Sequence, residues 1–192
     1  MGDSHEITTL DQLEAIYAAP NPQSLLKEVG QLTPEYKAWI EASPFVVLAS
    51  SGPGGLDCTP RGDLADICKI IDDHTLLLPD RPGNNRIDTL RNLLGDPRVA
   101  LLFLIPGRDE TIRGVGRAVI STDPTLLERC SVDGKRPKTV LVISIASVFF
   151  QCARSIKRSR IWSRSQDTTL PELPSVGKML QSFSNGTFDG AA

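Results

Sequence analysis

Basic and amide side chains gather in a short loop, residues 79–86, which reads Pro-Asp-Arg-Pro-Gly-Asn-Asn-Arg. Arg81 and Arg86 carry guanidinium groups that match phosphate oxygens two at a time. Asn84 and Asn85 add amide donors, and either one is a good N-cap for the helix that follows. Because a helix N-terminus offers unpaired N–H groups and the positive end of the helix dipole, the loop predicts an anion site. A capped surface helix with solvated arginines would look similar.

The elements on either side must position this loop. The apolar run 75–78 stops at Pro79, which is typical of a buried strand that ends there. Leucine and isoleucine residues recur at helical spacing over 87–94, so they fall on one face of a predicted helix. Gly95 begins a sequence that ends this helix. The run 99–105 is apolar throughout, as expected for a central strand. The pattern predicts strand, loop, helix and strand, with the loop at the start of the helix.

A second irregular stretch, Cys58-Thr-Pro-Arg-Gly-Asp63, lies one predicted strand earlier in the chain. Gly62 weakens a strand unless it marks a bulge or a close backbone approach. Arg61 and Asp63 therefore flank an irregular spot where they face another part of the molecule or a ligand. The alternative is a local ion pair between them.

Composition excludes several classes of protein. The net charge of −2 and the pI near 5.7 argue against general nucleic-acid binding, which needs a basic surface. No apolar run is long enough to cross a bilayer, and the first residues lack a signal-peptide pattern, so we expect a cytoplasmic protein. Four widely spaced cysteines and two histidines, His5 and His74, do not form a zinc motif, so we expect no metal site.

The remaining chain predicts a mainly β fold with flanking helices. Residues 8–43 read as a helical preamble, in which Thr33 caps a helix that has Pro34 at its first position. In strand 111–120, Gly114 and Gly116 share one face, where another backbone or a flat ring could approach closely. Further strands are expected over 45–50 and over 139–152. Between them, a strand segment is expected to start at residue 56, and the sheet is expected to continue over 67–71. A capped helix is expected at 122–128. About six strands in this order suggest a small barrel that carries helices outside.

The order of these motifs resembles the pyridoxamine 5′-phosphate oxidase-like flavoproteins, and more narrowly their bacterial FMN-dependent branch. The stretches that carry the resemblance are residues 58–63, 77–86, 96–107 and 151–162. The resemblance runs from about residue 10 to the low 180s. It implies a split β-barrel domain over 44–162, an N-terminal helical extension over 1–43 that packs on the barrel, and a tail over 163–192 that forms a loop and a short helix.

The resemblance also implies a homodimer with FMN in two clefts at the subunit interface. Asn84, Asn85 and Arg86, with Arg61 opposite, would hold the phosphate, next to Arg81. Pro79 and Asp80 would lie along the flavin edge through their backbones, while Thr111 and Arg113 occupy the strand that faces the ring. Arg158 and Trp162 match the tail residues that close the pocket.

The chain departs from the true oxidases in two places. Asn85-Arg86 stands where they have an Arg-Lys pair, and their C-terminal substrate contacts have no clear match, so pyridoxamine phosphate is not carried over as substrate. The expected function is an FMN-dependent oxidoreductase that acts on an unidentified small organic molecule, with NADH or NADPH as candidate electron donor and no assigned catalytic residue. The alternatives are a non-catalytic flavin carrier or redox sensor, and a split-barrel protein that uses haem or a deazaflavin.

Overall fold

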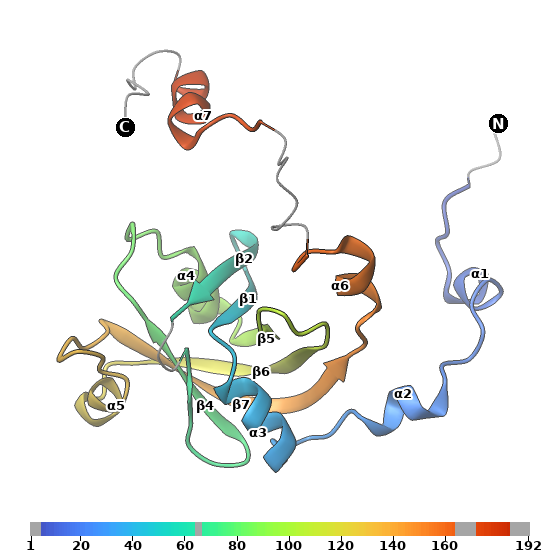
Figure 1. Cartoon of the computed structure of the whole chain (residues 1–192), viewed down its shortest axis with the longest axis horizontal. Helices are drawn as coiled ribbons and strands as arrows, with labels where there is room; N and C mark the ends of the chain where they lie inside the picture. Colours follow the sequence, from blue (N-terminus) through green and yellow to red (C-terminus); the bar gives the residue numbers. More distant parts are fainter. Residues whose placement is uncertain (1–4, 64–66, 164–171, 185–192) are drawn as a thin grey trace. The chain divides into compact units, whose positions relative to one another are not determined.

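The computed structural model describes residues 5–63, 67–163 and 172–184, and the chain divides into two compact units. The first unit, Met1–Ser155, contains the whole β-sheet and the first five helices (Figure 1). The second unit, Ile156–Ala192, contains most of α6 (Arg154–Ser159) and all of α7 (Val176–Phe183). The predicted boundaries at 43/44 and 162/163 stay predictions.

The first unit is built on one antiparallel sheet of seven strands in the order β2-β1-β5-β6-β7-β4-β3. The strands are β1 (Phe45–Gly52), β2 (Gly55–Gly62), β3 (Lys69–Ile70), β4 (Thr75–Asp80), β5 (Arg98–Leu104), β6 (Thr111–Ser121) and β7 (Thr139–Gln151). The mainly β class with flanking helices is confirmed, with seven strands instead of about six. The hydrogen-bonded ladder among the described residues is open, and its two edges are β2 and β3.

The first unit has five helices: α1 (Leu10–Glu14), α2 (Pro22–Leu26), α3 (Pro34–Glu41), α4 (Asp88–Gly95) and α5 (Pro124–Arg129). The last three contact strands of the sheet. The side chain of Thr33 accepts a hydrogen bond from the Tyr36 N–H, which confirms the predicted start of α3. The helix α4 packs against β1 and β2, so the loop before it lies near the β2 edge of the sheet (Figure 1).

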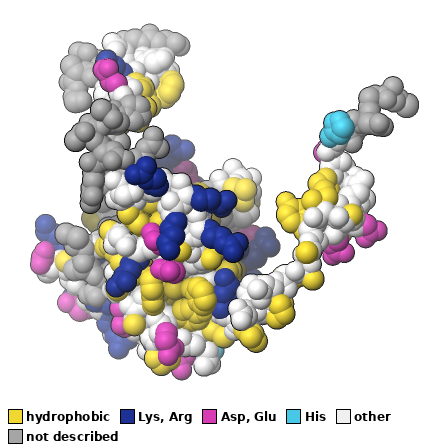
Figure 2. Space-filling model, turned by 45° about the vertical axis from the view of Figure 1, so that its right-hand side comes forward, with side chains coloured by type: hydrophobic (Ala, Val, Ile, Leu, Met, Phe, Trp, Pro, Cys, Tyr) yellow, Lys and Arg dark blue, Asp and Glu magenta, His cyan; other side chains and the backbone are white. Residues whose placement is uncertain are grey.

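Residues 5–26, which include α1 and α2, are exposed throughout. Figure 2 shows hydrophobic side chains along this segment, which include Leu10, Ile16 and Leu26. After this segment, Lys27 lies over the Phe149 and Phe150 rings of β7, and Val29 pairs with Val148 on the same strand. Among the described residues of the N-terminal extension, the contacts with the sheet therefore come from residues 27–41.

The glycine face of β6 lies inside the core. Gly114 lies against the side chains of Leu101 and Ile145, and Gly116 sits at a β-bulge beside the carbonyl of Ser144. A Cβ built at Gly116 would lie 2.3 Å from that carbonyl oxygen. The expected close backbone approach is confirmed at Gly116. The alternative of a flat ring on this face is wrong, because neighbouring chain fills the space.

The corner between α4 and β5 provides a test of the electrostatics. Hydrogen bonds from Arg98, with the guanidinium Nη2 2.5 Å from the carboxylate, lower the pKa of Asp96 to about 2. Since the pKa of Asp96 is lower in the folded state than in the unfolded state, the ionised carboxylate stabilises the folded protein above pH 4. This contribution to the free energy of unfolding is lost as the pH falls toward 2. We expect an NMR titration to give Asp96 a pKa near 2, and Arg98→Ala to return it toward 3.8. An unchanged pKa in the variant would contradict the assignment.

Candidate functional site

A hollow of about 520 Å³ opens where the ends of β2 and β4 meet the loop 81–87 and the start of β7. We call it the basic hollow, because its lining carries four cationic side chains and two carboxylates. The charged residues are Arg61, Asp63, Asp80, Arg81, Arg86 and Lys138. Apolar side chains from Ile67, Pro79 and Leu90 line other parts of its wall. Such a mixture of apolar wall and convergent polar groups is typical of a small-molecule site.

Two ion pairs connect the ends of β2 and β4 across the open side of the sheet. An Arg61 guanidinium nitrogen lies 2.8 Å from an Asp80 carboxylate oxygen, and Arg81 Nε lies 2.9 Å from Asp63 Oδ2. Arg81 also donates to the Cys130 carbonyl at 2.7 Å. Because β2 and β4 are not neighbours in the ladder, these side chains hold the two walls of the hollow together. The alternative of a local Arg61–Asp63 ion pair is wrong, since each residue has a partner on the β4 side.

The loop supplies amide groups through a tight turn. The Asn84 side-chain oxygen accepts the Arg86 N–H at 2.9 Å, and Asn85 adopts a left-handed φ of 58°. Asparagine tolerates that conformation better than most residues. The Asn85 side-chain oxygen accepts a hydrogen bond from Lys138 Nζ at 2.9 Å. Lys138 thereby joins the loop at one wall of the hollow.

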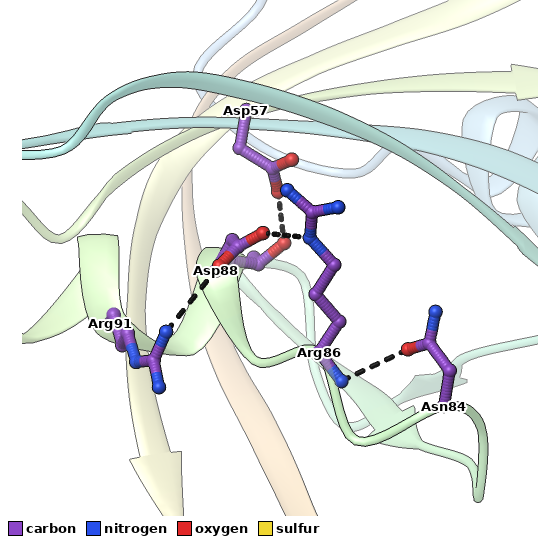
Figure 3. Close-up of polar contacts among 6 residues, drawn as sticks. Asp57, Asn84, Arg86, Asp88 and Arg91 are labelled. Atoms are coloured by element: carbon purple, nitrogen blue, oxygen red, sulfur yellow. Dashed lines mark hydrogen bonds and ion pairs between the residues drawn. The ribbon is translucent and has the colours of Figure 1, made fainter. Parts of the chain in front are cut away.

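The helix start differs from the prediction. The helix α4 begins at Asp88, its N-cap residue is Ile87, and no side chain caps it. Asp88 lies in the first turn and accepts a hydrogen bond from Arg86 Nε at 2.6 Å (Figure 3). This hydrogen bond raises the pKa of Arg86. The prediction of Asn84 or Asn85 as N-cap is wrong, and a carboxylate of the chain already occupies the first turn of α4, so any anion site must rely on side chains.

Two buried donors in the basic hollow lack a partner. They are Arg61 Nε and Thr139 Oγ1, and they are the buried side-chain polar atoms without a hydrogen bond in the part of the chain that the structure describes. Both residues line the hollow. Leaving a buried polar group unsatisfied costs about 1–3 kcal/mol, so such groups call for an explanation. Because a phosphate group accepts hydrogen bonds on every oxygen, a hollow lined by such donors and by four cationic side chains fits a phosphorylated ligand.

The predicted site residues separate into three groups. The hollow brings together Arg61, Pro79, Asp80, Arg81, Asn84, Asn85 and Arg86. Thr111 is buried on β6, and the Arg113 guanidinium carbon lies 5.5 Å from the centre of the Phe149 ring, so neither lines the hollow. Arg158 and Trp162 belong to the second unit. The roles of all these residues remain predictions.

The sequence reasoning missed Lys138 and Thr139. They begin β7, and Thr139 is the register partner of Asp80 at the end of β4. The available signal was a lysine directly before a long apolar strand, but its meaning depends on that register.

Within the described ranges, no cluster of histidine, cysteine or carboxylate side chains can hold a metal ion, and no helix is long and apolar enough to span a bilayer.

Comparison with known proteins identifies the family. The family model described as pyridoxamine 5′-phosphate oxidase matches residues 32–152, which is more than half of the chain and includes the whole sheet and every residue of the basic hollow. The chain belongs to the pyridoxamine 5′-phosphate oxidase family. The predicted family resemblance is thus confirmed, and the site described above lies within its family domain. No curated protein matches the sequence.

Solved structures support the fold. Group A Streptococcus HupZ matches with 21% identity over 62% of this chain and 92% of that chain, at a TM-score of 0.50. A histidine-to-alanine variant of HupZ matches with 20% identity over 62% and 99% of the two chains, at a TM-score of 0.52. General stress protein 26 from Bacillus anthracis shares 17% identity over 59% and 88%, at a TM-score of 0.46. At these identities the HupZ matches show a shared fold.

Proposed function

We propose that this pyridoxamine 5′-phosphate oxidase family protein binds FMN, with the phosphate in the basic hollow. The observation that carries the proposal is the pair of unpartnered buried donors, Arg61 Nε and Thr139 Oγ1, in a hollow whose side chains have a net positive charge. Arg61 would contribute the positive charge of its guanidinium, which its ion pair with Asp80 holds at the end of β4. Lys138 and Arg86 would add two further positive charges on the loop side.

We further propose that the protein is an FMN-dependent oxidoreductase with the split β-barrel architecture of its family. When bound, the flavin would supply hydride or electron transfer to a small organic substrate. The chain's own part is to bind the phosphate, to hold the walls of the hollow through the Arg61–Asp80 and Asp63–Arg81 ion pairs, and to exclude water with Ile67 and Leu90.

A homodimer belongs to this proposal. Thr111 and Arg113 lie on β6, outside the hollow of their own chain, so they would reach a flavin only through the partner subunit or a rearrangement. Arg158 and Trp162 are proposed to close the pocket from the tail. Formation of two composite sites per dimer would complete the apolar slot that the isoalloxazine ring needs.

The double variant Asn85→Ala/Arg86→Ala tests the loop. We expect its affinity for FMN to fall roughly 10- to 100-fold, because charge-assisted hydrogen bonds to the phosphate are lost. Riboflavin, which lacks the phosphate, should bind the variant and the wild type equally in a fluorescence titration. Lys135→Ala is the control, since it removes an exposed positive charge three residues before Lys138 and outside the hollow. Unchanged FMN affinity in the double variant would remove the loop from the site.

Turnover is tested separately from binding. The FMN complex is mixed with NADH or NADPH without oxygen, and the yellow absorbance is followed. Bleaching faster than that of free FMN is the result expected of an oxidoreductase. A complex that binds FMN tightly and is not bleached would instead indicate a flavin carrier or sensor.

A further inference from the structure

Residues 5–26, which we call the arm, carry apolar side chains that the chain's own sheet does not bury. Every residue of the arm is exposed. Its large apolar side chains are between 41% and 79% exposed: Ile7, Leu10, Leu13, Ile16, Tyr17, Leu25 and Leu26. Leu13 and Tyr17 also line a hollow of about 480 Å³ at the end of α1. Exposed apolar surface of this extent is typical of an interaction site.

The link between α1 and α2 is stiff and extended. Pro20 and Pro22 each fix a backbone φ angle, and a residue that precedes a proline is restricted to extended conformations. Asn21, between the two prolines, has φ −60° and ψ 127°. Such a link favours contact of α1 with another molecule over folding back on the chain's own sheet.

One face of the sheet has apolar side chains that lie outside the core. Val47, Leu102 and Val115 belong to neither hydrophobic cluster of the core and are only half-buried. They alternate with buried residues along β1, β5 and β6, and the pairing of these strands places them on one face. We call this surface the open face, and its residues are Val47, Ala49, Ala100, Leu102, Val115, Arg117 and Val119.

The arm and the open face are complementary in charge. The arm contains the carboxylates Glu6, Asp11 and Glu14, and it contains no lysine or arginine. The open face has the exposed guanidinium of Arg117, and Arg113 lies on the same side of β6. Opposite charges on two surfaces speed their association and fix their register. An acidic, apolar segment therefore suits this face.

The size of the arm matches what a stable interface between two copies needs. If each large apolar side chain of the arm buries about 100 Å², one arm buries roughly 700 Å². Two reciprocal arms, together with the surfaces that they cover, then exceed the lower limit of about 1,200 Å² for a stable interface. A symmetric pair in which each copy gives and receives the same segment is a common form of dimer.

We propose that the arm packs on the open face of a second copy of the chain, so that two copies exchange their arms. The inference rests on the homodimer of the proposed function and names the surfaces that hold it together. Apolar side chains of the arm would cover Val47, Leu102 and Val115 of the partner subunit. Carboxylates of the arm would lie beside Arg117 of the partner subunit.

The test measures the dimer dissociation constant of the full-length protein by sedimentation velocity over a range of concentrations. Leu10→Asp/Ile16→Asp, the arm variant, should raise this constant at least tenfold, because carboxylates replace apolar surface in a segment that is already acidic. Leu94→Asp/Leu173→Asp is the matched control. Both of its leucines are similarly exposed but lie outside the arm and the open face, so its dissociation constant should equal that of the wild type.

A mixing experiment separates exchange between copies from packing within one chain. Arg117→Glu/Val119→Asp, the face variant, changes two exposed residues of the open face and should weaken the dimer as the arm variant does. An equimolar mixture of the two variants should dimerise at least threefold more tightly than either variant alone. The mixed dimer keeps one intact arm on one intact open face, whereas neither variant alone keeps any such contact.

The outcomes separate this inference from the function on which it rests. An arm variant that dimerises like the wild type would overturn the inference, and so would a mixture that dimerises no better than its components. FMN titration of the same samples tests the proposed function independently. A wild-type dimer that depends on the arm but does not bind FMN would overturn the proposed function alone, and a monomeric wild type would overturn the exchange together with the proposed homodimer.

Discussion

Replacing Arg61 by alanine is expected to weaken FMN binding about 100-fold, a large effect for one side chain. Arg61 is only 23% exposed, and its Nε is buried without a partner while another nitrogen of the group pairs with Asp80. A phosphate at this place would receive a charge-assisted hydrogen bond in a partly desolvated setting, where such bonds are strong. The measurement is a fluorescence titration of the flavin-free protein with FMN.

Controls must separate lost binding from lost structure, because alanine also leaves Asp80 without its partner. Arg61→Lys keeps the charge but loses the planar fork, so it should weaken FMN binding about tenfold. Riboflavin should bind both variants as it binds the wild type, which would show that the rest of the pocket is intact. If Arg61→Ala binds FMN normally, the phosphate does not lie in the basic hollow.

Gly116→Ala is expected to lower the free energy of unfolding by about 3 kcal/mol, since inserted atoms in a packed core force backbone shifts. A Cβ at this position would lie 2.3 Å from the Ser144 carbonyl oxygen, across the bulge between β6 and β7. The contact is with backbone, so no side chain can rotate away to relieve it. Urea denaturation followed by circular dichroism measures the change.

Gly114→Ala is the matched control on the same strand and the same face. A Cβ there would meet only Ile145 and Leu101 side chains, at 3.7 Å or more, which is ordinary contact. We expect a change below about 1 kcal/mol. Equal losses in the two variants would mean that strand propensity, rather than the close approach of Ser144, explains the glycine at 116.

Most of the secondary structure was predictable because its signals are local. Thr33 and Pro34 mark the start of α3 within three residues of sequence, and the apolar run 99–105 covers all of β5 except its first residue. The start of α4 was misplaced because asparagine suits two roles. The Asn84 side chain accepts the Arg86 N–H and so closes a turn, instead of capping a helix. An asparagine shortly before a helix is the sequence pattern of both roles.

The site was predictable only in part, because it joins elements that are distant in sequence. The loop that contains Asn84 to Arg86 and the stretch around Arg61 were both found as irregular, charged segments. Their meeting depends on β2 and β4 lying on either side of the open sheet, which no local pattern specifies. Lys138 was missed for the same reason, since the pairing of Thr139 with Asp80 brings it to the hollow.

The measurement that tests the account most directly is the ratio of the affinities of wild-type protein for FMN and riboflavin. The two ligands differ only in the phosphate. We expect FMN to bind about 1,000-fold more tightly at low ionic strength, and the difference to shrink as salt is added. Equal affinity for the two, or no salt dependence of FMN binding, would contradict the assignment of the basic hollow as a phosphate site.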